Sequence, residues 1–186
     1  SSAASDVYKR QVFDGVAVAA DDVVPFQSAF ERPTTVGPFA QLLHAAIDTG
    51  IARGAYEDLL HFVRHKSRPW IDAGIDKASD DPLTQQDIGK LRVRLAASEA
   101  LLERAGEFVD LAQAAPDADS VAAASVAVAE ARAISTETSL LLGSKLLELA
   151  GSRATLAEHG LDRHWRNART HTCLLYTSDA ADDLLC

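Results

Sequence analysis

Cysteine is almost absent from this 186-residue chain, and the two that occur lie at one end. Cys173 and Cys186 both belong to the closing stretch CLLYTSDAADDLLC. Residues 12–172 therefore offer no disulfide, no zinc thiolate and no cysteine nucleophile. The sequence also has no uninterrupted apolar run near the roughly 20 residues that span a bilayer. We expect a cytoplasmic protein that does not bind a membrane.

Positive charge and catalytic motifs are scarce as well. The chain has 18 Lys and Arg against 27 Asp and Glu, a net charge of −9, which argues against non-specific nucleic-acid binding. It has no Gly-rich phosphate loop, no Ser–His–Asp arrangement and no carboxylate pair set apart by its surroundings. His164 and His171 stand seven residues apart without an acidic companion, which makes a poor metal site, so no metal is expected.

The two ends of the chain are related at the level of DNA. Codons for Ser5–Gln11 (SDVYKRQ), read on the opposite strand and shifted by one base, encode CLLYTS and an acidic residue, as in Cys173–Asp179. The pattern resembles a sequencing adaptor that flanks an insert in both orientations. We therefore expect residues 1–11 and 173–186 to be adaptor-derived and residues 12–172 to be the natural sequence, with both of its ends cut.

The pattern of residues 12–172 predicts an all-α, up-and-down helical bundle with one residual β-strand on its N-terminal side. Residues 12–25 favour that strand because Val and Phe alternate before Asp-Asp and Pro. Three long helices follow, with apolar residues at helical spacing. They are expected at about 38–68, 84–113 and 120–150, before short pieces at 154–158 and 162–169. The many alanines of the third helix imply close helix approach.

Basic residues stand near the ends of two long helices and in one later segment. Arg64 and Arg68 lie at the C-terminal end of the first, where cations interact favourably with the helix dipole or form an anion site. Arg153 follows the third helix, where the same two interpretations apply. The segment RHWRNARTHT, residues 163–172, concentrates cations, aromatic groups and two histidines in an otherwise acidic chain. The remaining histidines within helical patterns, His44, His61 and His159, are interpreted as structural.

Three stretches carry a family resemblance. They are a strand that exits at VVP, the helix with GIARGAYEDLLHFVRHKSRPW, and ELAGSRAT followed by LDRHWRNARTHT. Together they resemble the acyl-CoA dehydrogenase superfamily, and within it the branch of sulfur-acquisition oxidoreductases and dibenzothiophene-type flavin monooxygenases. The resemblance implies that residues 12–33 are the end of a middle β-domain with its linker, and that residues 34–172 are the C-terminal helical bundle domain.

The resemblance also implies roles for individual residues. Arg64 or Arg68 corresponds to an arginine that meets the flavin phosphate, often across a subunit boundary, and Arg153 falls where a neighbouring subunit supplies a flavin contact. A guanidinium fork suits phosphate oxygens, which gives the physical reason. His171 lies in the segment that lines the reactive face of the flavin. Family members continue beyond Thr172 to another histidine, which we expect to be the more important catalytic residue and which the adaptor-derived segment replaces here.

The expected function is that of a reduced-flavin monooxygenase, using FMN or FAD on small organosulfur compounds. By the resemblance the full-length protein is a homotetramer, and a flavin reductase could supply its reduced cofactor. Ordinary acyl-CoA dehydrogenases place a glutamate base near this point, yet residues 163–172 contain no carboxylate. A dehydrogenase of acyl thioesters is the first alternative, and a non-catalytic helical interaction module is the second. The domain alone is expected to be inactive.

Overall fold

The computed structural model describes residues 12–179, with side-chain surroundings for residues 12–172 apart from Ala29. The expected adaptor segment 1–11 lies outside the described residues, and so do positions 180–186 of the second one. The chain divides into two compact units, and the boundary along the sequence falls between Arg32 and Pro33.

The described part of the first unit, residues 12–32, contains no strand, and the prediction of one there was wrong. Two short 3₁₀ turns, Ala20–Asp22 and Phe26–Ala29, interrupt an otherwise extended backbone. Its local bonds are those of turns: Phe26 N–H donates to the Val24 carbonyl at 2.8 Å, and the Ser28 hydroxyl to the Pro25 carbonyl at 2.9 Å. An isolated segment has no neighbouring strand to pair with, so alternating Val and Phe cannot make a ladder by themselves.

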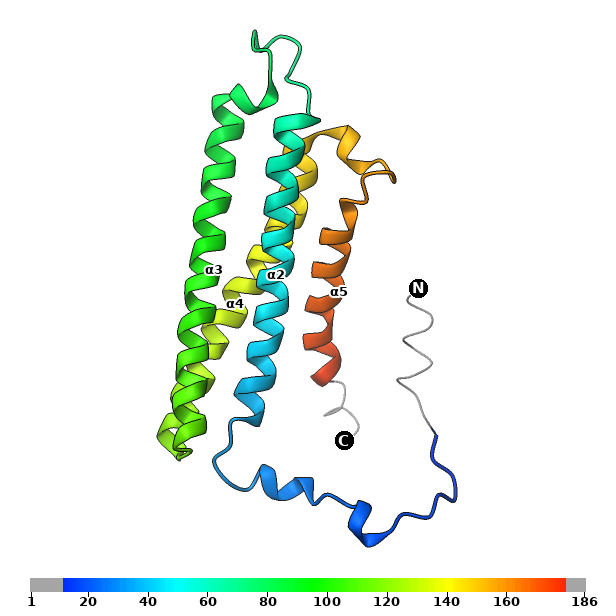
Figure 1. The fold of residues 1–186 in the computed structure, drawn as a ribbon, viewed down its shortest axis with the longest axis vertical. Helices are drawn as coiled ribbons and strands as arrows, with labels where there is room; N and C mark the ends of the chain where they lie inside the picture. Colours follow the sequence, from blue (N-terminus) through cyan, green and yellow to red (C-terminus); the bar gives the residue numbers. More distant parts are fainter. Residues whose placement is uncertain (1–11, 180–186) are drawn as a thin grey trace. The chain divides into compact units, whose positions relative to one another are not determined.

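The second unit is the expected all-α bundle (Figure 1). Three long helices run side by side, namely α2 (Val36–His65), α3 (Pro82–Ala114) and α4 (Ala118–Ala150). The shorter α5 (Asp162–Asp179) packs against α2 and α4. Short 3₁₀ turns, Ala78–Asp80 and Ser152–Thr155, lie in the connections. None of the described helices is both long and apolar enough to cross a membrane.

Local capping explains where two of the long helices begin. The carboxylate of Asp81 accepts hydrogen bonds from the backbone N–H groups of Leu83 and Thr84, with Pro82 in the first turn. A hydrogen bond from the Thr84 hydroxyl holds the pKa of Asp81 below its usual value. Asp117 and Ser120 form a reciprocal capping box at the start of α4. The second helix therefore begins two residues before Thr84, its expected start.

The fourth helix is longer than its sequence pattern predicted. We expected it to end near Arg169, but α5 continues to Asp179 because no Gly or Pro interrupts residues 162–179. Its inward face repeats at helical spacing through His164, Ala168 and His171, all of which are buried. The two histidines thus share one face, as their seven-residue separation indicated.

Small residues on the inner faces allow the helices to approach closely, as the alanine content predicted. Leucines and Phe62 fill one half of the core, whereas the other half contains mostly alanine. Gly143 on α4 is the tightest point: a Cβ there would lie 3.0 Å from the Cα of Trp165 and 3.2 Å from its backbone N. The backbone of α5 therefore sits directly on this glycine.

Replacing Gly143 with alanine should lower the free energy of unfolding by about 1–3 kcal/mol, because the added methyl group forces α5 away from α4. Gly50→Ala is the matched control: this helical glycine has nothing within 4 Å of an added Cβ. It should gain up to about 1 kcal/mol from helix propensity. Urea unfolding followed by circular dichroism measures both, and equal changes would contradict the close packing of α5.

Candidate functional site

A charged cluster lies buried at the middle of the bundle. Asp48 of α2 is completely buried, and Arg132 of α4 and His171 of α5 are nearly so. Each comes from a different helix, and each occupies the inward face of its own. Charged groups at such positions require partners, since an isolated buried charge costs many kcal/mol. These three residues must therefore satisfy one another's charges and hydrogen bonds within the core.

Asp48 is the centre of this cluster, and both of its carboxylate oxygens are occupied. Oδ2 accepts from Nη1 of Arg132 and from the Thr136 hydroxyl, the latter at 2.9 Å. Oδ1 lies 2.6 Å from Nδ1 of His171. A carboxylate can only accept, so the hydrogen of this bond belongs to Nδ1 of His171. The bond fixes both the orientation and the tautomer of the imidazole.

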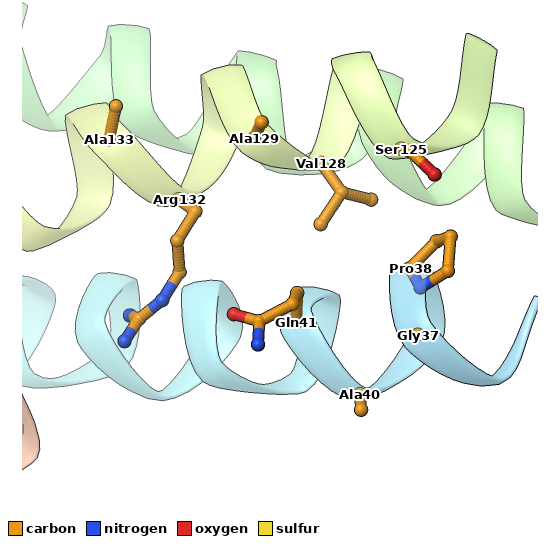
Figure 2. Close-up of a pocket in the computed structure, with 9 residues that line it drawn as sticks. All are labelled: Gly37, Pro38, Ala40, Gln41, Ser125, Val128, Ala129, Arg132 and Ala133. Atoms are coloured by element: carbon orange, nitrogen blue, oxygen red, sulfur yellow. The ribbon is translucent and has the colours of Figure 1, made fainter. Parts of the chain in front are cut away.

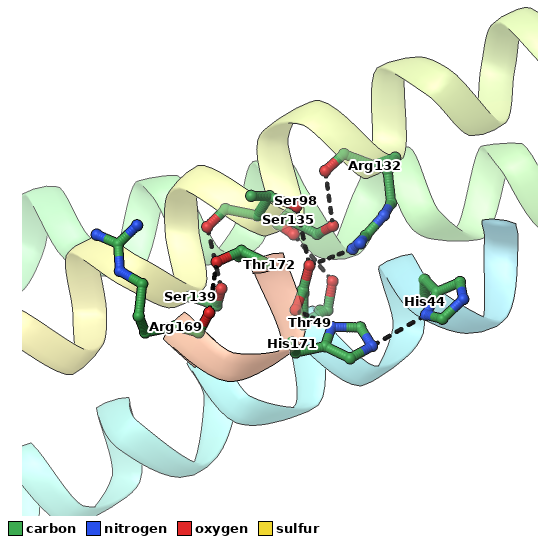
Figure 3. Close-up of polar contacts among 11 residues, drawn as sticks. His44, Thr49, Ser98, Arg132, Ser135, Ser139, Arg169, His171 and Thr172 are labelled. Carbon is green, nitrogen blue, oxygen red and sulfur yellow. Dashed lines mark hydrogen bonds and ion pairs between the residues drawn. The ribbon is translucent and has the colours of Figure 1, made fainter. Parts of the chain in front are cut away.

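A second imidazole continues the chain of contacts toward the surface. Nε2 of His171 lies 3.0 Å from Nδ1 of the half-buried His44, one turn before Asp48 on α2 (Figure 3). Burial lowers the pKa of His44, and the charges of His171 and Arg132 lower it further, while Asp48 acts in the opposite direction. His44 therefore tends to be neutral and able to donate from one ring nitrogen while it accepts at the other.

A mostly apolar cavity of about 630 Å³ borders the cluster. It lies between the first turns of α2, with Pro38 and Gln41, and the middle of α4, with Val128 and Arg132 (Figure 2). Nη1 of Arg132 is bound to Asp48, while Nε and Nη2 are buried without a partner among the described residues. Arg132 thus belongs to the charged cluster and to the cavity wall.

The arginines expected to bind a cofactor lie elsewhere. Arg68 and Arg153 line one cavity of about 300 Å³, where the Ser67 hydroxyl bonds to the Ala150 carbonyl at 3.0 Å. Arg64 lines a different cavity, of about 320 Å³. All three side chains are exposed, and within the described part of the chain none forms an ion pair. The structure therefore brings together Arg68 and Arg153, but not Arg64.

These arginines are far from His171 within one chain. Along α4, the distance from Arg132 to Ala150 is about 27 Å at 1.5 Å per residue. That is longer than a molecule of flavin mononucleotide. The Arg68–Arg153 cavity and the His171 of one chain therefore lie well apart along the bundle.

The other histidine of RHWRNARTHT has a different environment. Nε2 of His164 lies 2.7 Å from Oδ2 of Asp58, which Arg163 also contacts at 2.5 Å. The His164 ring packs over Gly54, where a Cβ would come within 3.1 Å of its Cε1. This arrangement joins the beginning of α5 to α2.

Sequence reasoning missed three members of the buried cluster, namely His44, Asp48 and Arg132. The four-residue spacing of His44 and Asp48, on one helix face, was an available signal. Arg132 was another, as a lone cation among the alanines of ARAIS. Neither signal identifies the partner helix, so neither predicts the cluster by itself.

Residues 42–178 match the sequence model of the family described as acyl-CoA dehydrogenase, C-terminal domain. The chain belongs to this family. A dibenzothiophene monooxygenase of Mycolicibacterium goodii is 34% identical over 170 residues, which cover 86% of this chain and 41% of that protein. A Pseudomonas putida protein described as a probable FMNH2-dependent monooxygenase, SfnC, is 35% identical over 136 residues, covering 72% and 34%.

Solved structures also resemble this acyl-CoA dehydrogenase-type domain, in sequence and in fold. The complex of TdsC from Paenibacillus sp. A11-2 with FMN and indole has a TM-score of 0.80 and 33% identity, over 87% of this chain and 43% of that one. The expected family and helical fold are thus confirmed. The chain spans about two fifths of the length of these relatives.

Proposed function

We propose that this domain belongs to a monooxygenase that uses reduced FMN to oxygenate small organosulfur compounds. The observation that carries the proposal is the bond between Asp48 and His171, which fixes the tautomer of a buried histidine and directs its Nε2 toward His44. The similarity to dibenzothiophene monooxygenase and to an FMN complex of TdsC supports the same chemistry. A flavin reductase would supply the reduced cofactor, in the cytoplasm.

The proposed roles follow from the residues of this chain. Bound reduced flavin would supply the electrons that activate oxygen. His171 is the proposed catalytic residue, held in one tautomer by Asp48 so that its Nε2 can exchange a proton through His44. Arg132 donates to the other oxygen of Asp48 and supplies the opposite charge in the core. The cavity beside it is mostly apolar.

The buried carboxylate itself argues against an acyl-CoA dehydrogenase. Abstraction of a proton next to a thioester requires a carboxylate with a free oxygen within reach of substrate. Asp48 is fully buried, and both of its oxygens already accept hydrogen bonds. Residues 163–172, where a dehydrogenase base is expected, contain no carboxylate. The cluster is suited to holding a histidine rather than to deprotonating a carbon acid.

Arg68 and Arg153 are the residues that we propose to hold the flavin phosphate, while Arg64, which lines a different cavity, is the weaker candidate. Their exposed guanidinium groups share no ion pair with described residues, and two of them line one cavity, which fits a phosphate group. Because they are about 27 Å from the His171 cluster along α4, a second copy of the chain would supply them. A homotetramer with shared flavin sites satisfies this geometry.

In the complete enzyme, Arg153→Ala should weaken FMN binding by about tenfold, because a charge-assisted hydrogen bond to an anion contributes roughly 1.5–3 kcal/mol. Fluorescence quenching during FMN titration measures the dissociation constant. Arg166→Ala is the control, since this exposed arginine of α5 pairs with Asp162 at 3.1 Å. Equal FMN affinity in Arg153→Ala and wild type would remove Arg153 from the cofactor site.

The chemistry is tested with a complete protein that contains this domain. Aerobic incubation with reduced FMN and a sulfone or dibenzothiophene should give an oxygenated product. Anaerobic incubation with acyl-CoA esters and an artificial electron acceptor should give none. The reverse outcome, acyl-CoA oxidation without oxygenation, would replace the monooxygenase proposal with the dehydrogenase.

A further inference from the structure

We propose that His44, His171 and Asp48 form a proton relay, with His44 as the terminal at which protons enter and leave the buried cluster. Only the use that the enzyme makes of this relay depends on the monooxygenase function proposed above; the relay itself rests on the contacts in this chain. Its physical basis is two consecutive hydrogen bonds. Oδ1 of Asp48 lies 2.6 Å from Nδ1 of His171, and Nε2 of His171 lies 3.0 Å from Nδ1 of His44.

The direction of each bond follows from the chemistry of Asp48. Its carboxylate can only accept, so Nδ1 of His171 carries a hydrogen and Nε2 of the neutral ring carries a lone pair. That lone pair needs a donor, and the atom facing it is Nδ1 of His44. The neutral His44 ring must then carry its hydrogen on Nδ1 and its lone pair on Nε2. This is the less common tautomer of a free histidine side chain.

Proton transfer along this line is balanced at every atom. A proton that binds Nε2 of His44 allows the Nδ1 proton of the same ring to move to Nε2 of His171. His44 becomes neutral again, with its hydrogen on the other nitrogen, and His171 becomes an imidazolium bonded to ionised Asp48. No bond between heavy atoms forms or breaks, and the reverse sequence returns the proton to the exterior.

The surrounding charges support the transfer of a proton away from His44. Burial lowers the pKa of His44, as do His171 from α5 and Arg132 from α4, whereas Asp48 on its own helix opposes them. The third packed helix, α3, contributes Ser98, whose hydroxyl bonds to that of Thr49 at 3.0 Å. An imidazolium at His44 is therefore disfavoured, while one at His171 lies directly against the carboxylate.

The half-buried position of His44 makes it the outer end of the relay. Its Nε2 has no hydrogen-bond partner among the described residues, and its ring extends away from His171 (Figure 3). His44 also lies one helical turn after Gln41, which lines the apolar cavity. A purely structural histidine would satisfy the His171 lone pair but would not need to exchange protons with it.

The test is histidine NMR on the ¹⁵N-labelled 186-residue chain, without flavin. At alkaline pH, where both rings are neutral, long-range ¹H–¹⁵N spectra should show His44 with its hydrogen on Nδ1, and protonation of His171 should move that hydrogen to Nε2. In His171→Phe, His44 should return to the Nε2–H tautomer, and its titration midpoint should rise because a positive neighbour is removed. The exposed His61 provides the internal control and should not change.

At alkaline pH, where both rings are neutral, a His44 that carries its hydrogen on Nε2 in the wild-type chain would overturn the relay, even if His171→Phe fails to fold. In the complete enzyme, His44→Phe should lower kcat by about tenfold, as expected for lost proton transfer, with the FMN dissociation constant unchanged. An unchanged kcat would also overturn the relay. The relay and the monooxygenase function can be tested separately. If the wild-type enzyme does not oxygenate, the monooxygenase function is contradicted, but the NMR result on the relay still stands.

Discussion

Replacing Asp48 with alanine should lower the free energy of unfolding by about 3–5 kcal/mol. The substitution removes the partner of a buried guanidinium: Arg132 would keep its charge, and its Nε and Nη2 already lack partners among the described residues. It also removes the acceptors of the Thr136 hydroxyl and of His171. Few single substitutions in this bundle combine a lost charge partner with three lost hydrogen bonds.

The matched control is Glu130→Ala, which removes a carboxylate that also pairs with an arginine of a neighbouring helix. The Arg104–Glu130 pair is 2.5 Å long, but its side chains are 44% and 48% exposed. Water compensates such charges, so the loss should stay below about 1 kcal/mol. Urea unfolding of both variants gives the comparison. A loss in Asp48→Ala as small as that in Glu130→Ala would mean that the cluster is hydrated rather than buried.

The helices were predictable because their signals are local. Apolar residues at helical spacing predicted them, and the caps that the structure shows at Asp81 and Asp117 are also contained within single turns of the chain. The strand expected at residues 12–25 rested on an equally local pattern, but a strand also needs a partner, which residues 12–32 do not provide. Local sequence patterns therefore predicted the helices, whose hydrogen bonds lie within one segment, and failed for the strand, whose hydrogen bonds require a second segment.

The buried cluster was not predictable in the same way. Asp48 and Arg132 are separated by 84 positions, and Asp48 and His171 by 123. A single carboxylate on a helix is usually solvated, so Asp48 resembles every other surface aspartate until the helices are assembled. His171 was identified because its segment resembles a known family. His44, which lies outside that segment, was interpreted as structural.

In the complete enzyme, His171→Ala should lower the rate of oxygenation by about tenfold or more, within the usual range for loss of a general acid or base. Removal of the ring takes away the nitrogen that exchanges protons and leaves Oδ1 of Asp48 without its donor. Because the proposed phosphate arginines are at a different end of the bundle, FMN binding should change little. The effect should therefore appear in kcat rather than in the FMN dissociation constant.

Two further variants separate chemistry from stability. His171→Gln retains an N–H donor for Asp48 but cannot carry a proton at neutral pH, so it should lose as much activity as His171→Ala while remaining more stable. His61→Ala removes an exposed histidine of α2, whose ring lies 4.9 Å from that of His65, and should keep full activity. Loss of activity in all three variants would indicate a general effect of removing histidine.

The most direct measurement is the oxygenation rate of His171→Gln relative to wild type, at saturating reduced FMN and equal protein concentration. We expect a decrease of about tenfold or more, because proton exchange at His171 is lost, together with an unchanged FMN dissociation constant and a folded circular dichroism spectrum. Equal rates in the two proteins would contradict it, because they would show that oxygenation proceeds without proton exchange at His171.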